Sequence, residues 1–280
     1  MSDISHIDRV IRGYVHPGAV LWRTIELETI KDLVGDRRLV EPMLDLGCGE
    51  GIVGLALFGQ GCRVVGLEYD RESMMAARNL GAYGSVVGGD GRDLPFRPES
   101  MGTIVSNCVI EHIREAEDVL ESVSQTLRPG GCFLFTVPTR EFGDLLFFST
   151  VFRKCGFKGG AELYSRVRNE RLNHYHCYAP DEWQRRLASH GLDVIAYRKY
   201  MSHKLTMLWD IMSVLVYVLT RAHAWSIVEW LMLNSRRADG VRVRVMNRWI
   251  QGVIRRLDKS AGEGGGLAIL SIKKGGTNIA

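Results

Sequence analysis

Short apolar runs alternate with helical stretches from residue 42 onward, and this alternation limits the possible folds more than any other feature. The runs have the length of strands and lie at 43–46, 63–69, 85–89, 103–106, 132–137 and 193–199. Helical spacing of apolar residues fills the stretches between them, at 52–58, 72–80, 116–127 and 181–189. Strands that alternate with helices predict an α/β fold with a doubly wound, mostly parallel sheet and crossover connections.

The chain divides into three parts by pattern. Residues 1–40 mix polar and apolar positions at helical spacing, and we expect a helical lead-in there. Residues 41–200 and 260–280 form the α/β domain, because a last apolar run near the C-terminus can return to the sheet. Residues 201–259 are expected to be a helical insertion before that last strand. A connection of this length is usually functional in a compact domain, so we expect the insertion to contact a substrate or a surface.

A glycine-rich turn, LDLGCGEG at 44–51, follows the first predicted strand. Glycines let the backbone approach a ligand closely and adopt positive φ without strain. Residues 49–54 also match G-x-G-x-x-G, so an NAD(P)-dependent oxidoreductase is one alternative. Asp45 argues against a pyrophosphate, because a carboxylate repels phosphate and attracts a ligand with ammonium and sulfonium groups. The plainer alternative is that Asp45 only caps the turn.

Acidic residues follow the second and third predicted strands. Glu68 lies about 20 residues after the glycine turn, where an acid can accept hydrogen bonds from both hydroxyls of a ribose. Asp90 lies in GDGRDLPF, and a carboxylate next to a backbone amide can pair with the amino group and ring nitrogen of adenine. The sequence therefore predicts a nucleoside site at these strand ends.

Five segments in this order resemble the class I S-adenosylmethionine-dependent methyltransferases, particularly the branch that methylates small molecules and lipids. They are LDLGCGEG, the acid that ends the second strand, GDGRDLPF, VSNCVIEHI and LRPGGCFLFTVP. The resemblance implies a seven-stranded Rossmann-like methyltransferase sheet with a reversed terminal strand, and S-adenosyl-L-methionine as the cofactor. It also implies the cofactor-binding residues. Asp45, Gly47, Cys48, Gly49 and Gly51 would surround the methionine moiety, Glu68 would bind the ribose and Asp90 the adenine, and Asn107 would contribute its backbone. Tyr69 and Gly91 are further cofactor-binding candidates.

Three histidines are candidates for acid–base chemistry. His112 lies in VIEHI and is a candidate base, with a packing or cofactor-side role as the alternative. His174 and His176 are two residues apart, so an extended segment would point both to one side, where a neutral imidazole can take a proton from the methyl acceptor. A structural hydrogen bond from a loop histidine is the alternative, and two histidines without a third ligand do not predict a metal site. Methyl transfer by proximity alone needs no base.

Charge and cysteine content bear on partners and compartment. The formal net charge of +4 is too small to indicate nucleic acid. Six cysteines are scattered without a CxxC pair, which predicts neither a zinc site nor a disulfide framework. The N-terminus lacks the pattern of a signal peptide, so we expect a cytoplasmic protein.

Residues 201–259 combine an apolar helix with a basic cluster. Residues 205–219 are nearly all apolar with a narrow polar stripe, and a second run carries Trp225 and Trp230, which suit a boundary between oil and water. The basic cluster has eight arginines and lysines against two aspartates, at 236, 237, 242, 244, 248, 255, 256 and 259 against 239 and 258.

This combination predicts peripheral attachment to the inner membrane surface or contact with a lipid-linked substrate. Interrupting charges argue against a membrane-spanning helix. The alternative is a helical pair packed on the sheet or in a homodimer. We therefore expect a methyltransferase that acts on a small-molecule or lipid-linked acceptor, and the remaining alternative is a non-catalytic protein that only binds S-adenosylmethionine.

Overall fold

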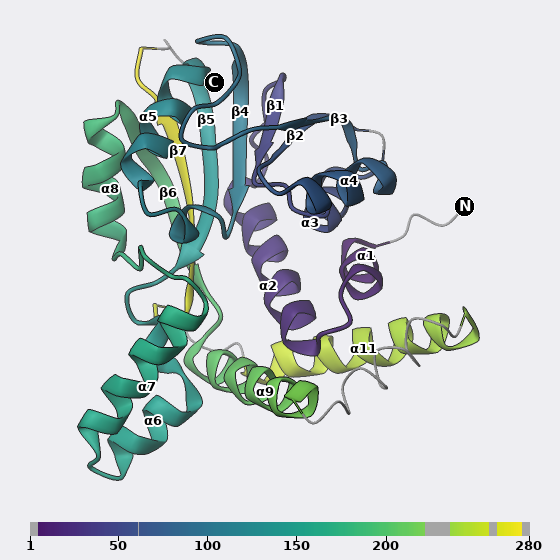
Figure 1. Cartoon of the computed structure of the whole chain (residues 1–280), viewed down its shortest axis with the longest axis vertical. Helices are drawn as coiled ribbons and strands as arrows, with labels where there is room; N and C mark the ends of the chain where they lie inside the picture. The colour runs from purple at the N-terminus through teal and green to yellow at the C-terminus, as the bar shows by residue number, and fades with distance from the viewer. Residues whose placement is uncertain (1–4, 61, 222–235, 258–261, 276–280) are drawn as a thin grey trace.

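A seven-stranded sheet organises the computed structural model, which describes residues 5–60, 62–221, 236–257 and 262–275 (Figure 1). The strands lie in the order β3-β2-β1-β4-β5-β7-β6. All neighbouring pairs are parallel except those of β7, which is antiparallel to both β5 and β6. The bounds are β1 Met43–Leu46, β2 Cys62–Glu68, β3 Tyr83–Gly88, β4 Met101–Asn107, β5 Leu127–Pro138, β6 Leu192–Tyr200 and β7 Gly266–Lys273. The predicted doubly wound, mostly parallel sheet with one reversed strand is confirmed.

Helices cover both faces of this sheet. Their bounds are α1 His6–Gly13, α2 Pro17–Val34, α3 Ile52–Phe58, α4 Arg71–Leu80, α5 Ala116–Thr126, α6 Phe147–Lys154, α7 Lys158–Arg171, α8 Pro180–Ser189, α9 His203–Arg221 and α11 Arg236–Leu257, with short 3-10 turns η1 Ile110–His112 and η2 Phe142–Leu145. Side chains of successive strand residues point to opposite faces. Phe133 and Phe135 of β5 therefore join the core under α5 and α8, while Leu134 joins the core under α2.

The N-terminal segment supplies part of the cover of the sheet. Helix α2 begins at Pro17, and the His16 side chain accepts hydrogen bonds from the first free backbone amides, those of Gly18 and Ala19. Leu21 and Ile25 are buried, and α2 contacts both β6 and β7. The segment that we expected as a lead-in thus packs against the reversed strand β7. Helix α1 contacts both α2 and α11.

The insertion between β6 and β7 is helical, as predicted. Helix α9 packs against α2 and α6, and α11 packs against α1. Figure 1 shows α9 and α11 below the sheet. The second apolar run, with Trp225 and Trp230, lies outside the described residues. Among the described helices, none combines the length and the apolar character that crossing a bilayer requires.

The site follows from the strand order. Parallel strands β1, β2 and β4 all present their carboxyl ends at the same edge of the sheet, and the order reverses between β1 and β4. Open α/β sheets bind ligands at such a reversal, outside the carboxyl ends of the strands.

Candidate active site

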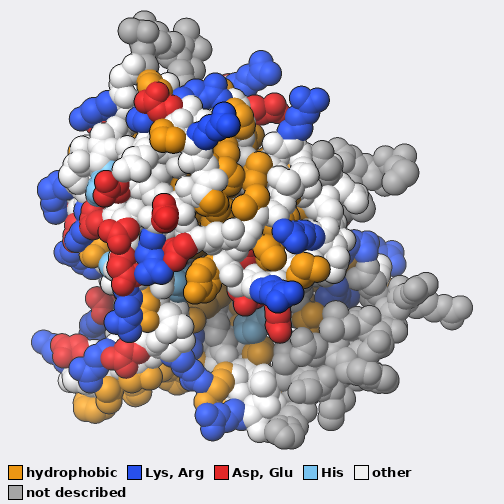
Figure 2. Space-filling model, turned by 45° about the horizontal axis from the view of Figure 1, so that its top comes forward, with side chains coloured by type: hydrophobic (Ala, Val, Ile, Leu, Met, Phe, Trp, Pro, Cys, Tyr) orange, Lys and Arg blue, Asp and Glu red, His pale blue; other side chains and the backbone are white. Residues whose placement is uncertain are grey.

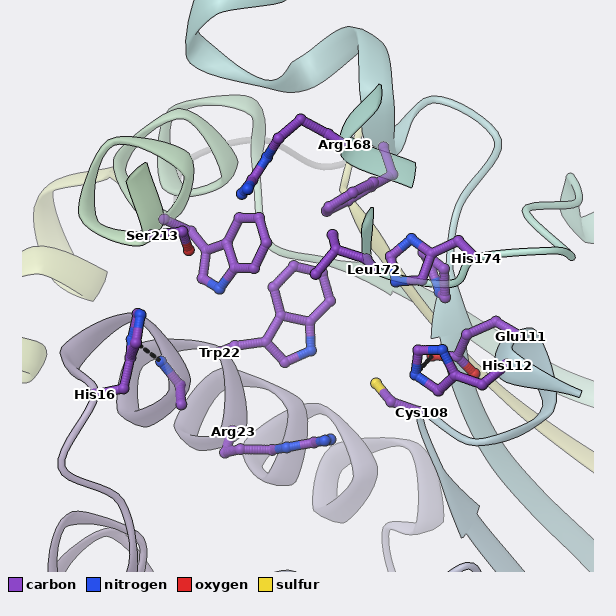
Figure 3. Close-up of a pocket in the computed structure, with 14 residues that line it drawn as sticks. His16, Trp22, Arg23, Cys108, Glu111, His112, Arg168, Leu172, His174 and Ser213 are labelled. Atoms are coloured by element: carbon purple, nitrogen blue, oxygen red, sulfur yellow. Dashed lines mark hydrogen bonds and ion pairs between the residues drawn. The ribbon is translucent and has the colours of Figure 1, made fainter. Parts of the chain in front are cut away.

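Three cavities meet at this edge of the sheet. The turn cavity, of about 400 Å³, lies around the glycine turn after β1. The strand-end cavity, of about 460 Å³, lies beyond β2 and β3. The aromatic cavity, of about 430 Å³, lies between α2, α7 and α9 (Figure 3). Gly47 lines the first two cavities, Cys108 and His112 line the strand-end and aromatic cavities, and Arg23 lines the turn and aromatic cavities.

The glycine turn takes a conformation that other residues would strain. Gly47, Gly49 and Gly51 have φ angles of 73°, 53° and 86°. A Cβ atom at Gly47 would also overlap the side chain of Val109. The backbone amide of Gly49 donates a 2.7 Å hydrogen bond to Oε2 of Glu68. The turn after β1 and the acid that ends β2 are therefore held together as one surface.

Asp45 is buried at the floor of the turn cavity. Its carboxylate accepts a 2.6 Å hydrogen bond from the hydroxyl of Tyr83, and burial raises the pKa of Asp45 to about 6. A Cβ atom at position 54 would overlap that hydroxyl, so Gly54 makes room for the Tyr83 ring. Tyr83 was missed by the sequence analysis because the predicted strand began at residue 85, after this residue.

Asn107 lines the same cavity at the end of β4. Both polar atoms of its side-chain amide are buried and have no hydrogen-bond partner among the described residues. A buried amide without partners is costly unless a ligand pairs with it. The cationic ammonium and the carboxylate of a methionine moiety fit this pair of Asn107 and Asp45, whereas we expected only the backbone of Asn107 to contribute.

Glu68 and Asp90 lie in the strand-end cavity, as the sequence predicts for two adjacent strand ends. The other carboxylate oxygen of Glu68 accepts a 2.9 Å hydrogen bond from the amide of Asp70. The Asp90 carboxylate is turned toward Arg92, and the hydrogen bonds from that side chain hold the pKa of Asp90 below its usual value. Tyr69 lies at the rim of the strand-end cavity and is 80% exposed.

Most of the predicted cofactor-binding residues line the turn cavity or the strand-end cavity. They include Gly47, Cys48, Gly49, Glu68, Tyr69, Asp90, Gly91 and Asn107.

Aromatic side chains from three distant segments form the third cavity. Trp22 of α2, Phe142 of η2 and Trp209 of α9 contact one another edge to face or tilted, with ring centroids 5.5–5.9 Å apart. Polar side chains interrupt this apolar wall, as Figure 3 shows, and they include His16, Arg23, Glu111, His112, Arg168, His174 and Ser213. An apolar pocket with a few convergent polar groups suits a small organic ligand.

The structure brings two of the three candidate histidines, His112 and His174, together at the aromatic cavity. Nδ1 of His112 bonds the backbone carbonyl of Asn173 at 3.2 Å, and the ring lies on the wall that the strand-end and aromatic cavities share. His174 lines the aromatic cavity, with its ring centroid 5.5 Å from that of His112. Burial lowers the pKa of His174 to about 3, so its imidazole is neutral and a weak base.

His176 does not share a side with His174, which corrects the expectation from their spacing. Nε2 of His176 bonds the carbonyls of Ile113 and Arg114 at 2.8 and 3.0 Å, and Nδ1 bonds the hydroxyl of Tyr178. The segment is irregular rather than a strand, so alternation does not govern the direction of its side chains. His176 thus holds a loop that borders the strand-end cavity.

A buried charged cluster under the aromatic cavity was also missed. Arg23 Nη1 and Glu26 Oε2 form a 2.6 Å ion pair, and the other oxygen of Glu26 accepts hydrogen bonds from Thr136 and Tyr200. Glu111 is buried nearby, and burial raises its pKa to about 8. Arg23 and Glu26 lie three residues apart on α2, between the buried residues Leu21 and Leu27. This placement of opposite charges among buried positions was the signal available in the sequence.

Comparison with known proteins identifies the domain that carries the glycine turn and the two acidic strand ends. Residues 44–135 match the family model of a methyltransferase domain. A probable S-adenosylmethionine-dependent methyltransferase of Mycolicibacterium smegmatis is 29% identical over 113 residues, which are 40% of this chain and 44% of that protein. The ubiquinone biosynthesis O-methyltransferase of Aliivibrio fischeri is 28% identical over 43% of this chain and 52% of its own length. The chain thus spans about half the length of the curated relatives it matches.

A solved structure shows the same fold at low identity. Phosphoethanolamine N-methyltransferase 2 of Haemonchus contortus, in complex with S-adenosyl-L-methionine, is 15% identical, with a TM-score of 0.52 over 89% of this chain and 52% of that chain. The family match, the ordered motifs and the reversed strand β7 agree with one another. Residues 44–135 therefore form a methyltransferase domain, and the chain has the fold of the class I S-adenosylmethionine-dependent methyltransferases.

Proposed function

We propose that this chain transfers a methyl group from S-adenosylmethionine to a small acceptor whose apolar body occupies the aromatic cavity. One observation carries the proposal: the aromatic cavity shares His112 and Cys108 with the strand-end cavity, and shares Arg23 with the turn cavity. A cofactor that spans the turn and strand-end cavities therefore lies next to any acceptor in the third. Proximity of this kind can supply much of the rate of a two-substrate reaction.

The turn cavity and the strand-end cavity would each bind one part of the cofactor. Asp45 and Asn107 would hold the charged methionine end, while Glu68 would accept hydrogen bonds from the ribose. When bound, the cofactor supplies a sulfonium-activated methyl group. Trp22 and Trp209 would exclude water from the acceptor, which protects the transfer from side reactions.

A direct experiment separates this function from its alternatives. Calorimetry with S-adenosylmethionine and with NAD(P), followed by transfer of a labelled methyl group into small-molecule extracts, should show binding of the first cofactor and one labelled product. Mass spectrometry of a deletion strain should then reveal a metabolite that is lighter by one methylene. Binding of NAD(P) alone would favour an oxidoreductase, and cofactor binding without any transfer would favour a non-catalytic protein.

Cofactor affinity is expected to fall as the pH drops through 6. Asp45 has a raised pKa of about 6, so its carboxylate is charged above that pH and neutral below it. Loss of the charge removes the attraction to a cationic ligand, and each pH unit below the pKa lowers the charged fraction about tenfold. Calorimetry between pH 5 and 8 measures this, and Asp45→Asn should bind more weakly and show no such dependence. An equally steep loss in Asp45→Asn would contradict the role of Asp45.

We also propose that α11 attaches this chain peripherally to an anionic membrane surface. Val241, Val245 and Trp249 lie one helical turn apart and are exposed, and exposed Arg244 and Arg248 lie beside them. An apolar ridge flanked by arginine is typical of a helix in the plane of the lipid headgroups. Figure 2 shows a further group of exposed hydrophobic side chains at its lower left, where α6 and α7 lie.

Flotation with liposomes tests this attachment. The chain should float with anionic vesicles at low salt, float less as salt rises, and not float with neutral vesicles. A double variant, Val245→Glu with Trp249→Glu, should lose flotation because it places charge in the apolar ridge. Ile195→Glu is the matched control, because Ile195 is an exposed apolar residue on β6. A dimer that buries α11 and never floats would contradict the proposal.

A further inference from the structure

Glu111, His112 and His174 converge at the wall of the aromatic cavity. Each offers one nitrogen or oxygen atom, and these three atoms lie within 4.8 Å of one another. His112 Nε2 is 3.9 Å from Glu111 Oε1. Figure 3 shows His112 beside Glu111 and the His174 ring above them. We propose that these three side chains bind one divalent metal ion of the zinc or cobalt type.

One nitrogen of each imidazole already bonds an oxygen acceptor. Nδ1 of His112 bonds the carbonyl of Asn173 at 3.2 Å, and Nδ1 of His174 bonds Oδ1 of Asn169 at 3.1 Å. If each Nδ1 donates its proton, each Nε2 is left with a free lone pair. Metal-ligating histidines almost always have such a partner on the other ring nitrogen, which fixes the tautomer and the ring orientation.

Glu111 supplies the observation that is independent of the histidines. Its side chain is 1% exposed, and Oε2 has no hydrogen-bond partner among the described residues. The neighbouring cation Arg23 forms its 2.6 Å ion pair with Glu26, and its charge acts on Glu111 from a distance. A buried carboxylate oxygen without a partner is costly, and a bound cation would remove that cost.

The donor set favours a particular class of metal. Two imidazoles and one carboxylate suit zinc and its neighbours better than magnesium, which prefers oxygen ligands. Zinc bonds near 2.1 Å place neighbouring donors ~3.4 Å apart, so the three groups need to close by about 1 Å. Three protein ligands would leave an open position that faces the aromatic cavity.

The chemistry of that open position depends on the proposed function. A metal-bound acceptor hydroxyl loses its proton to water more readily, because the cation stabilises the resulting oxyanion. The oxyanion electron pair then forms the bond to the methyl carbon as the carbon–sulfur bond breaks. The products are a methyl ether and the neutral thioether S-adenosylhomocysteine. The inference therefore narrows the acceptor to one with a hydroxyl beside its apolar body.

Metal titration of chelator-treated protein tests the site without any turnover. Visible absorption with Co²⁺ and calorimetry with Zn²⁺ should each show a specific site filled by one ion per chain. His112→Ala and His174→Ala should each weaken that binding by more than about 100-fold, because loss of an outer partner alone costs about 10–100-fold. Asn169→Ala removes such an outer partner and should fall in that 10–100-fold range.

His190→Ala is the matched control, because His190 bonds Glu117 and does not line the cavity. It should bind Zn²⁺ as the wild type does. Absence of stoichiometric binding, or a double variant of His112 and His174 that binds within threefold of wild type, would overturn the site. Circular dichroism of each variant shows whether the fold is intact.

The failure of this inference is distinct from the failure of the proposed function. A protein that transfers methyl groups at full rate after chelation, and that binds no Zn²⁺, contradicts the metal site alone. A protein that binds Zn²⁺ through these residues but neither binds S-adenosylmethionine nor transfers methyl groups contradicts the proposed function and supports the metal site.

Discussion

Alanine at position 112 is expected to lower turnover of the methyl acceptor by 10²–10⁴-fold, the range of a group that moves a proton in the transition state. His112 lines both the strand-end and the aromatic cavity, so it lies where the cofactor and the acceptor meet. Its ring either takes the acceptor proton or holds the metal that promotes its loss. Steady-state kinetics with an identified acceptor measure the effect on turnover. Calorimetry with S-adenosylmethionine measures separately any loss of cofactor affinity, because the ring also lines the strand-end cavity.

His176→Ala provides the matched control for this experiment. The His176 ring bonds loop carbonyls at Ile113 and Arg114, which border the strand-end cavity, and it does not line the aromatic cavity. The variant should keep its kcat and raise the KM for the cofactor. If turnover of the His112 variant stays within about threefold of wild type, His112 is not required and catalysis rests on proximity alone.

The second large effect concerns stability. Asp210→Ala is expected to lower the free energy of unfolding by about 3–5 kcal/mol, because it leaves a buried guanidinium without its counter-charge. The Asp210 side chain is fully buried, with Nε of Arg168 at 3.2 Å and the hydroxyl of Tyr164 bonded to both of its oxygens. These contacts join α7 to α9 beside the aromatic cavity. Urea unfolding monitored by tryptophan fluorescence measures the change.

Asp181→Ala is the control for that measurement. Asp181 pairs with Arg185 one turn along α8, and both side chains are more than two-thirds exposed. Exposed pairs of this kind contribute little to stability, so the urea midpoint of this variant should match the wild type. A loss below about 1 kcal/mol in Asp210→Ala would show that Arg168 finds water or another partner, and the pair would then not hold α9 in place.

The fold and the cofactor side could be predicted because their signals are local. An apolar run followed by glycine or an acidic residue marks each strand end in the sequence. The topology of the sheet brings those strand ends to one edge. Gly47, Glu68 and Asp90 therefore lie where the sequence places them. Their roles toward the cofactor stay predictions.

The acceptor side could not be predicted in the same way. Trp22, Phe142 and Trp209 come from three segments far apart in the chain, and only tertiary packing shows that their rings meet. The same holds for Glu111, His112 and His174, whose donor atoms lie within 4.8 Å of one another, whereas the pair of histidines that the sequence suggested was His174 and His176. The prediction that His176 points to the same side as His174 was wrong. Side chains alternate in direction along regular strands, and the segment that contains His176 is irregular.

The pairing of Tyr200 with Gly266 has an evolutionary consequence. These residues lie opposite each other where β6 ends and β7 begins, so everything between them leaves and rejoins the sheet at one point. A short turn could close the two strands into a hairpin, because the cost of closing a loop changes slowly with its length. The cost of closing the loop therefore allows residues 201–265 to vary as a unit between related chains, while the buried Arg168–Asp210 pair and the packing of α9 on α2 and α6 restrict what can replace them. Such a change would replace Trp209 and Ser213 on the acceptor wall while β1, β2 and β4 keep the cofactor in place.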